Sequence, residues 1–166
     1  MQHTEKSQAD CLQSEGGFGL MGDSGDDIEK ARKVFSSGKY TCVLCSGDNI
    51  ACSTETGITP LIRWLNENLV FPGYSAADKI VGKAAAFLYV LLGIKEIFAP
   101  VMSTSAMKVF SHFGIKFSCI SSVNAIINRT GSGSCPMDEA VKNLQIDLKN
   151  SPEEAFGILK EKCRYM

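Results

Sequence analysis

One stretch of the sequence decides the predicted fold: Asp78-Lys79-Ile80-Val81-Gly82-Lys83-Ala84-Ala85-Ala86-Phe87-Leu88-Tyr89-Val90-Leu91-Leu92. Its apolar residues recur at the i, i+4, i+7 spacing of a helix, and little polar surface remains around that stripe. Just upstream, Ser75-Ala76-Ala77-Asp78 has the pattern of a capping box. We therefore predict a buried helix over residues 78–92, in the middle of a domain.

Two lysines, Lys79 and Lys83, lie one turn apart at the start of this predicted helix, with Gly82 beside them. Like charges at that spacing cost about 0.2–0.5 kcal/mol, and cations at a helix N-terminus oppose the helix dipole. An anion that met this face would offset both costs, and Gly82 would let it approach the backbone. The alternative is that both lysines reach solvent from the rim of the core.

The length and composition predict one domain that binds neither nucleic acid nor a membrane. The chain has 166 residues and a net charge of −1, so it lacks the bulk charge that attracts nucleic acid or an anionic membrane. Its longest apolar run, residues 84–92, is too short to cross a bilayer. An odd number of cysteines without a secretory signal is typical of a cytoplasmic protein.

The order of the remaining elements predicts the architecture. Residues 1–25 are rich in glycine and polar residues and are expected to form a flexible tail, which leaves residues 26–166 as the folded domain. The elements expected in that domain are a helix over 27–36, a hairpin over 40–52, a helix over 60–65, the helix over 78–92, a strand over 96–101, a helix over 106–113, a strand over 116–120, a short strand over 124–128, a helix from residue 136 and a helix over 152–163. Helices between strands, with short connections, predict a three-layer α/β/α sandwich.

The residues available for metal or triad chemistry are few. Cys42 and Cys45 have the spacing C-x-x-C, but on a strand positions three apart point to opposite faces, so the pair cannot share a zinc ion. The two histidines are His3, in the tail, and His112, within a predicted helix. We therefore predict no metal site, no cofactor and no Ser–His–Asp arrangement.

Two further pairs of side chains have alternative interpretations. Glu55 and Arg63 are the polar residues of their region that could face a pocket, although a solvated surface is favoured. Phe71 and Tyr74 lie in a predicted loop and would suit a lid or an interface between copies of the chain. A homo-oligomer is accordingly one expectation.

A glycine-serine loop, residues 131–135, leads into the predicted helix at Pro136. Such loops expose backbone N–H groups, and with a helix N-terminus they make an anion site. A helix N-terminus also activates a thiol, which makes Cys135 the best candidate nucleophile. Against this, Asp138 and Glu139 already complement the helix dipole, and the spacing fits neither a P-loop nor a dinucleotide fingerprint.

Three segments carry a resemblance to a known family: ADKIVGKAAA (residues 77–86), GIKE (93–96) and INRTGSGSCPMD (127–138). Together they resemble a bacterial family of unknown function with the cytidine-deaminase-like fold, over roughly residues 27–163. The resemblance implies a hairpin followed by helices that alternate with strands in a mixed sheet.

The resemblance implies a fold without the usual reaction. Zinc deaminases carry H-x-E on the central helix and P-C-x-x-C at the start of the next one. Residues 82–85 and 100–105 stand in those places here, and they supply neither zinc ligands nor the proton-shuttling glutamate. Other zinc-free members of the fold transfer a formyl group to a purine-precursor nucleotide or transfer sulfur through a cysteine.

The implied pocket lies where the starts of the two helices converge, under the glycine-serine loop. The candidate catalytic residues are Lys83, Cys135 and Asp78. The candidate ligand-binding residues are Lys79, Gly82, Ser103, Thr104, Ser105, Arg129, Gly131, Ser132, Gly133 and Ser134. The expected ligand is a small anionic molecule, such as a nucleotide or a phosphorylated metabolite.

Two alternatives stay open beside this hypothesis. In the first, the chain is a non-enzymatic interaction module whose lysines meet an acidic partner or its own carboxylates, of which Asp78, Asp138 and Glu139 are the obvious ones. In the second, Cys135 is the nucleophile of a sulfur or acyl transfer.

Overall fold

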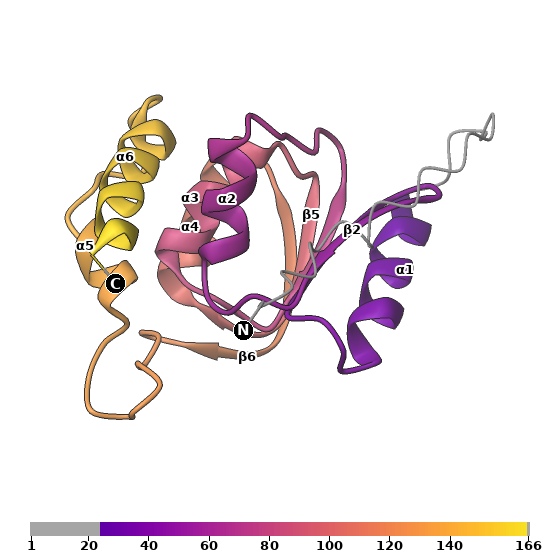
Figure 1. Cartoon of the computed structure of the whole chain (residues 1–166), viewed down its shortest axis with the longest axis horizontal. Coiled ribbons are helices and arrows are strands. Elements are labelled where there is room, and N and C mark those ends of the chain that lie inside the picture. The colour runs from indigo at the N-terminus through magenta and orange to yellow at the C-terminus, as the bar shows by residue number, and fades with distance from the viewer. Residues whose placement is uncertain (1–23, 166) are drawn as a thin grey trace, which may run out of the picture.

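The computed structural model describes residues 24–165 (Figure 1). Most of the predicted tail, residues 1–23, lies outside the described residues. The helices in this part of the chain are α1 (Ser24–Ser36), α2 (Thr59–Asn66), α3 (Lys83–Leu92), α4 (Thr104–His112), α5 (Pro136–Val141) and α6 (Ser151–Arg164). The strands are β1 (Cys42–Ser46), β2 (Asn49–Ser53), β3 (Ser75–Asp78), β4 (Ile80–Val81), β5 (Glu96–Ser103) and β6 (Lys116–Val123).

The six strands form one mixed sheet. β1 pairs antiparallel with both β2 and β3, which confirms the predicted hairpin. β5 pairs parallel with β3, with β4 and with β6. β2 is therefore the edge strand on one side of the sheet, and β6 is the edge strand on the other. The predicted α/β class and mixed sheet are both confirmed.

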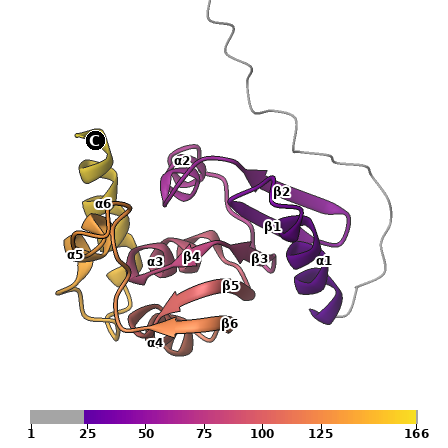
Figure 2. The ribbon, with the colours of Figure 1, turned by 90° about the horizontal axis from the view of Figure 1, so that it is seen from below.

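Helices pack against both faces of the sheet. α1 covers one face, where its Ile28 and Ala31 join Val43, Cys45 and Phe98 in a separate hydrophobic cluster. The larger cluster lies on the opposite face and includes residues of α2, α3 and α4. α5 and α6 pack against α3, at the end of the molecule away from α1 (Figure 2). α3 is consequently enclosed by the sheet and by helices.

The two cysteines of the C-x-x-C spacing lie on opposite faces of β1. Cys42 belongs to the cluster with α3, and Cys45 belongs to the cluster with α1. The prediction that they cannot share a metal ion is confirmed, because the pleat of a strand separates positions three apart.

The central helix begins five residues later than predicted. The expected capping box, residues 75–78, is strand β3, and Ile80–Val81 is strand β4. Gly82 is the N-cap of α3, so Lys79 and Lys83 do not share a helix face. The prediction failed because a short apolar run fits both a strand and a helix, and pairing with β5 decided for the strand. The end of the helix at Gly93 is confirmed, with φ of 81°.

Two loops also differ from expectation. The ring of Phe71 is buried and packs edge-on against Trp64, with centroids 5.1 Å apart, and the backbone N–H of Phe71 donates to Leu92 O. This segment therefore packs on the end of α3 instead of forming a lid. Residues 124–128 do not form a strand, since Ile127 makes only an isolated bridge to Ser134 that closes the glycine-serine loop.

Candidate functional site

Polar side chains gather at one end of the sheet. Ser53 of β2, Cys42 of β1 and Asp78 of β3 stand in one row across three neighbouring strands. The parallel strands β3, β5 and β6 run toward this end, where β5 finishes at Ser103. We call this region, marked by Ser53, Asp78 and Ser103, the polar end of the sheet. Ligands of open α/β sheets bind outside the carboxyl ends of parallel strands, so the site is sought here.

The N-terminus of α3 is closed by a carboxylate of the chain itself. Asp138, on α5, accepts a hydrogen bond at Oδ1 from the backbone N–H of Ala84, at 2.9 Å. A Cβ added to Gly82 would overlap Asp138 Oδ2, so only glycine admits the carboxylate here. Burial raises the pKa of Asp138, while hydrogen bonds from the N–H groups of Ala84 and Lys83 lower it. The place expected for an external anion is therefore taken by Asp138.

The side chain of Lys83 is buried and hydrogen-bonded within the protein. Its Nζ donates to Lys142 O at 2.9 Å and to Leu144 O at 2.7 Å, both just past the end of α5. Burial lowers the pKa of Lys83, and the nearby Asp138 carboxylate raises it. Lys83 thus ties α3 to the chain that follows α5, whereas Lys79 is exposed.

Asp78 belongs to a buried polar cluster. The Tyr89 hydroxyl donates to Asp78 Oδ2 at 2.6 Å and lies 3.0 Å from Cys42 Sγ, while the Lys79 N–H donates to Asp78 Oδ1 at 2.6 Å. Burial raises the pKa of Asp78 to about 6, and the hydrogen bonds from Tyr89, Lys79 and Ile80 oppose that rise. A carboxyl that titrates near neutrality can exchange a proton, but Tyr89 and Cys42 enclose this one.

The serines at the start of α4 have separate environments. Ser103 is buried, and its Oγ accepts the backbone N–H of Ala106 at 3.1 Å, so Ser103 is the N-cap of α4. Thr104 is exposed and Ser105 is half-buried. Thr104 therefore offers the accessible hydroxyl of this group.

Asn128 organises the glycine-serine loop. Its Oδ1 accepts the Ser132 N–H and the Thr130 hydroxyl, both at 3.0 Å, and its Nδ2 donates to Ser132 Oγ at 3.2 Å. The four candidates Gly131, Ser132, Gly133 and Ser134 are all exposed. The loop is thus held in one shape by an asparagine that the sequence did not single out.

Arg129 extends from this loop toward the segment that joins β2 to α2. A Cβ placed on Gly57 would lie 4.0 Å from Arg129 Nη2, so the guanidinium lies beside the turn before α2. Among residues 24–165, no ion pair engages Arg129 or Lys79. These two exposed cations are therefore the members of the predicted set that remain available to a ligand.

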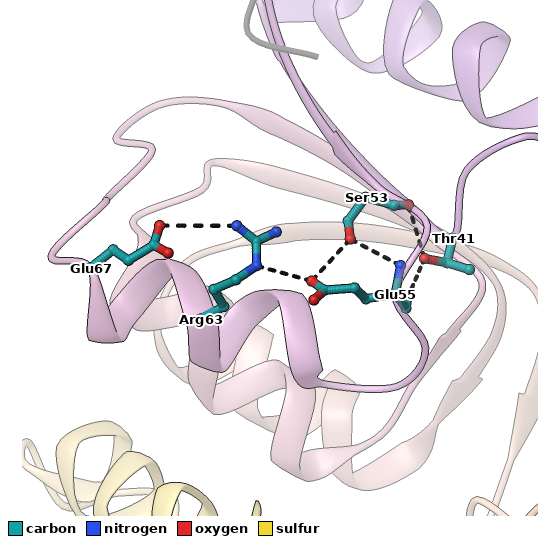
Figure 3. A network of polar contacts seen from close by, with 5 residues as sticks. All are labelled: Thr41, Ser53, Glu55, Arg63 and Glu67. Atoms are coloured by element: carbon teal, nitrogen blue, oxygen red, sulfur yellow. Dashed lines mark hydrogen bonds and ion pairs between the residues drawn. The ribbon is translucent and has the colours of Figure 1, made fainter. Parts of the chain in front are cut away.

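A network between β2 and α2 completes the polar end (Figure 3). Arg63 Nε donates to Glu55 Oε2 at 3.1 Å, and Ser53 Oγ donates to the same oxygen at 3.3 Å. Arg63 also pairs with Glu67 at 3.9 Å, and the Thr41 hydroxyl donates to Ser53 O at 3.0 Å. Glu55 and Arg63 thus bind each other at a half-buried position, where the sequence favoured a solvated surface.

Cys135 is the N-cap of α5 and is half-buried. Its backbone N–H donates to Ile126 O at 2.9 Å, and its side chain makes no capping hydrogen bond.

Within residues 24–165, no three His, Cys, Asp or Glu side chains are grouped so that they could hold a metal ion. No helix in this part of the chain is long and apolar enough to span a membrane.

Comparison with known proteins gives a family and a structural neighbour. Residues 30–163 match the family model TM1506, described as a domain of unknown function (DUF1893). The crystal structure of a DUF1893 protein from Thermotoga maritima matches with a TM-score of 0.73 and 24% identity, covering 93% of this chain and 99% of that one. No curated protein matches the chain. The family match spans most of the sequence, and the chain therefore belongs to the DUF1893 family.

Proposed function

We propose that the protein binds a small anionic molecule, such as a nucleotide or a phosphorylated metabolite, at the polar end of the sheet. Arg129 and Lys79 make the contact in this proposal, and Lys83 does not. The observation that carries it is the position of Arg129, which lies beside Gly57 without an ion-pair partner among the described residues. A guanidinium forms paired, charge-assisted hydrogen bonds with phosphate, so Arg129 is suited to this ligand class.

The loop that carries Arg129 supports the same proposal. Asn128 holds residues 130 and 132 through both atoms of its amide, so the loop loses little freedom when a ligand binds. Ligand sites commonly place exposed N–H groups and hydroxyls near such a cation, and Ser132, Ser134 and Thr104 supply them here.

We also propose the finer fold assignment. Helices on both faces of a mixed sheet, with α3 and α4 each starting after a strand that ends at the polar end, favour the cytidine-deaminase-like three-layer sandwich without its zinc ligands. We also propose that the protein is cytoplasmic.

For a catalytic function, Asp78 is the candidate acid or base, and Cys135 is the candidate nucleophile of a sulfur or acyl transfer. The pH dependence of Cys135 alkylation tests that transfer chemistry.

A second candidate function has its own support. Asp138 caps α3 and Lys83 binds two carbonyl groups, so two of the charges expected to meet a ligand are satisfied within the chain. This favours a non-enzymatic interaction module, in which the polar end is a structural junction.

Titration of the purified protein with a panel of nucleotides and inorganic phosphate, followed by calorimetry and thermal shift, separates the two functions. We expect one phosphorylated ligand to bind, and Arg129→Gln and Lys79→Gln each to raise its dissociation constant about tenfold. Arg164→Gln is the matched control, since Arg164 is an exposed arginine near the end of α6. Absence of binding by the folded wild type, or equal binding by Arg129→Gln, would favour the interaction module.

A further inference from the structure

The strand β6 is an edge strand of the sheet. Seven of its residue pairs are with β5, and no other described strand pairs with it (Figure 2). Its other side consequently presents backbone N–H and C=O groups in the geometry that accepts another strand. Ile120, at its centre, is 77% exposed, although it is among the most apolar residue types.

Among residues 24–165, β6 lacks the usual protection of an edge strand. Natural proteins protect edge strands from pairing with another chain by means of lysine, proline, a β-bulge or a covering element. Between Phe117 and Val123 there is neither a charged residue nor a proline, and the pairing with β5 runs past Ile120 toward Ser103. On the face of Ile120, the sheet borders an open groove of about 800 Å³ between α1 and β5.

Residues 117–123 of β6 have a similar order of residue types in both chain directions. Around Ile120, Cys119 mirrors Ser121, Ser118 mirrors Ser122, and Phe117 mirrors Val123. Each mirrored pair therefore matches a small residue with a small residue, or a large apolar residue with another apolar residue. A strand of this kind is complementary to itself when it runs antiparallel, which is the arrangement that a two-fold axis produces.

We propose that β6 is the interface of a homodimer, in which two copies pair their β6 strands antiparallel about a two-fold axis at Ile120. The two Ile120 side chains then face each other as cross-strand neighbours, and Phe117 faces the partner's Val123. Lys116, the charged residue of the strand, faces the partner's Asn124, so the two Lys116 side chains lie at opposite ends of the interface. The two sheets become one continuous sheet, and the β6 strand of each copy is then paired on both sides.

The oligomeric state in solution tests this interface. Light scattering after size exclusion, over a range of protein concentrations, should give a dimer for the wild type. Ile120→Lys places two ammonium groups opposite each other and should raise the dimer dissociation constant at least about tenfold. Ile127→Lys is the matched control, because Ile127 is 65% exposed and lies outside β6. A monomeric wild type, or an Ile120→Lys variant that dimerises as tightly as the wild type, overturns the proposal.

A cross-link tests the register. Ile120→Cys brings two thiols together across the axis, at the spacing of an antiparallel side-chain pair. Under mild oxidation it should form a covalent dimer at least about tenfold faster than Ile127→Cys. Equal rates for the two variants overturn the proposed register. Circular dichroism shows that each variant is folded, so loss of dimer cannot be mistaken for unfolding.

Discussion

Asp138 and Gly82 touch across the junction of α5 and α3, and the contact requires that Gly82 have no side chain. The carboxylate reaches past Gly82 to the Ala84 N–H and closes the helix that the rest of the protein surrounds. The acceptor oxygen at this cap comes from a residue 54 positions later in the sequence than Ala84. The junction is therefore a point where a small change should have a large effect.

Gly82→Ala should lower the free energy of unfolding by about 2 kcal/mol or more, because the new methyl group displaces Asp138 and leaves the helix uncapped. Gly157→Ala is the control, since a Cβ there meets nothing within 4 Å. That change should instead stabilise α6 by about 0.5–1 kcal/mol. Urea unfolding of both variants measures the difference, and equal effects of the two changes would contradict the role given to Gly82.

Lys83→Met should lower the free energy of unfolding by about 1–3 kcal/mol. The reason is that the carbonyl groups of Lys142 and Leu144 lose their donor in a partly buried place. Lys79→Met, at an exposed side chain, should change stability by less than about 0.5 kcal/mol. Denaturant titration compares the two lysines directly. If Lys79→Met were as costly as Lys83→Met, the exposed position described for Lys79 would be wrong.

The buried carboxyl of Asp78 should make stability depend on pH. Its pKa is raised from 3.8 to about 6, so the folded protein holds this proton more tightly than the unfolded chain does. The resulting stabilisation is complete below the unfolded pKa and is lost as the pH rises through about 6. Between about pH 4 and pH 7, the wild type should lose up to about 3 kcal/mol relative to Asp78→Asn. Unfolding of both proteins across this range measures the loss, and a constant difference would show that Asp78 does not titrate there.

Asn128→Ala should loosen the glycine-serine loop while leaving the fold intact. The change removes the three hydrogen bonds that the amide makes to Thr130 and Ser132. Amide hydrogen exchange over residues 129–134 should quicken about tenfold, with global stability changed by less than about 0.5 kcal/mol. Asn143→Ala, at an exposed position after α5, is the control. Unchanged exchange in the loop would mean that its backbone bonds alone hold it.

Much of the fold was predictable because its signals are local. The hairpin around Gly47, the end of α3 at Gly93 and the cap of α4 at Ser103 all depend on residues close together in the sequence. The start of α3 was not predictable in this way. Residues 78–82 fit both a strand and a helix, and the choice depends on pairing with β5, which begins fourteen residues after Gly82.

The partners within the site were harder to predict than its members. Asp78, Gly82, Lys83 and Asp138 were all recognisable from their residue types. However, Lys83 binds carbonyl groups 59 and 61 positions away, and backbone carbonyl groups leave no signature in a sequence. The pairing of Glu55 with Arg63 likewise depends on how β2 and α2 are placed. Long-range geometry decided which charges were satisfied internally.

The dependence of α3 on α5 has a consequence for biosynthesis. A ribosome makes the central helix before it makes Asp138, Lys142 and Leu144. Until those residues emerge, the nascent chain has an uncapped helix and an unsatisfied lysine at its centre. The junction of α3 and α5 should thus form only after residues 136–144 have emerged from the ribosome, and a chain truncated before Pro136 should be recognised by chaperones and proteases as incompletely folded.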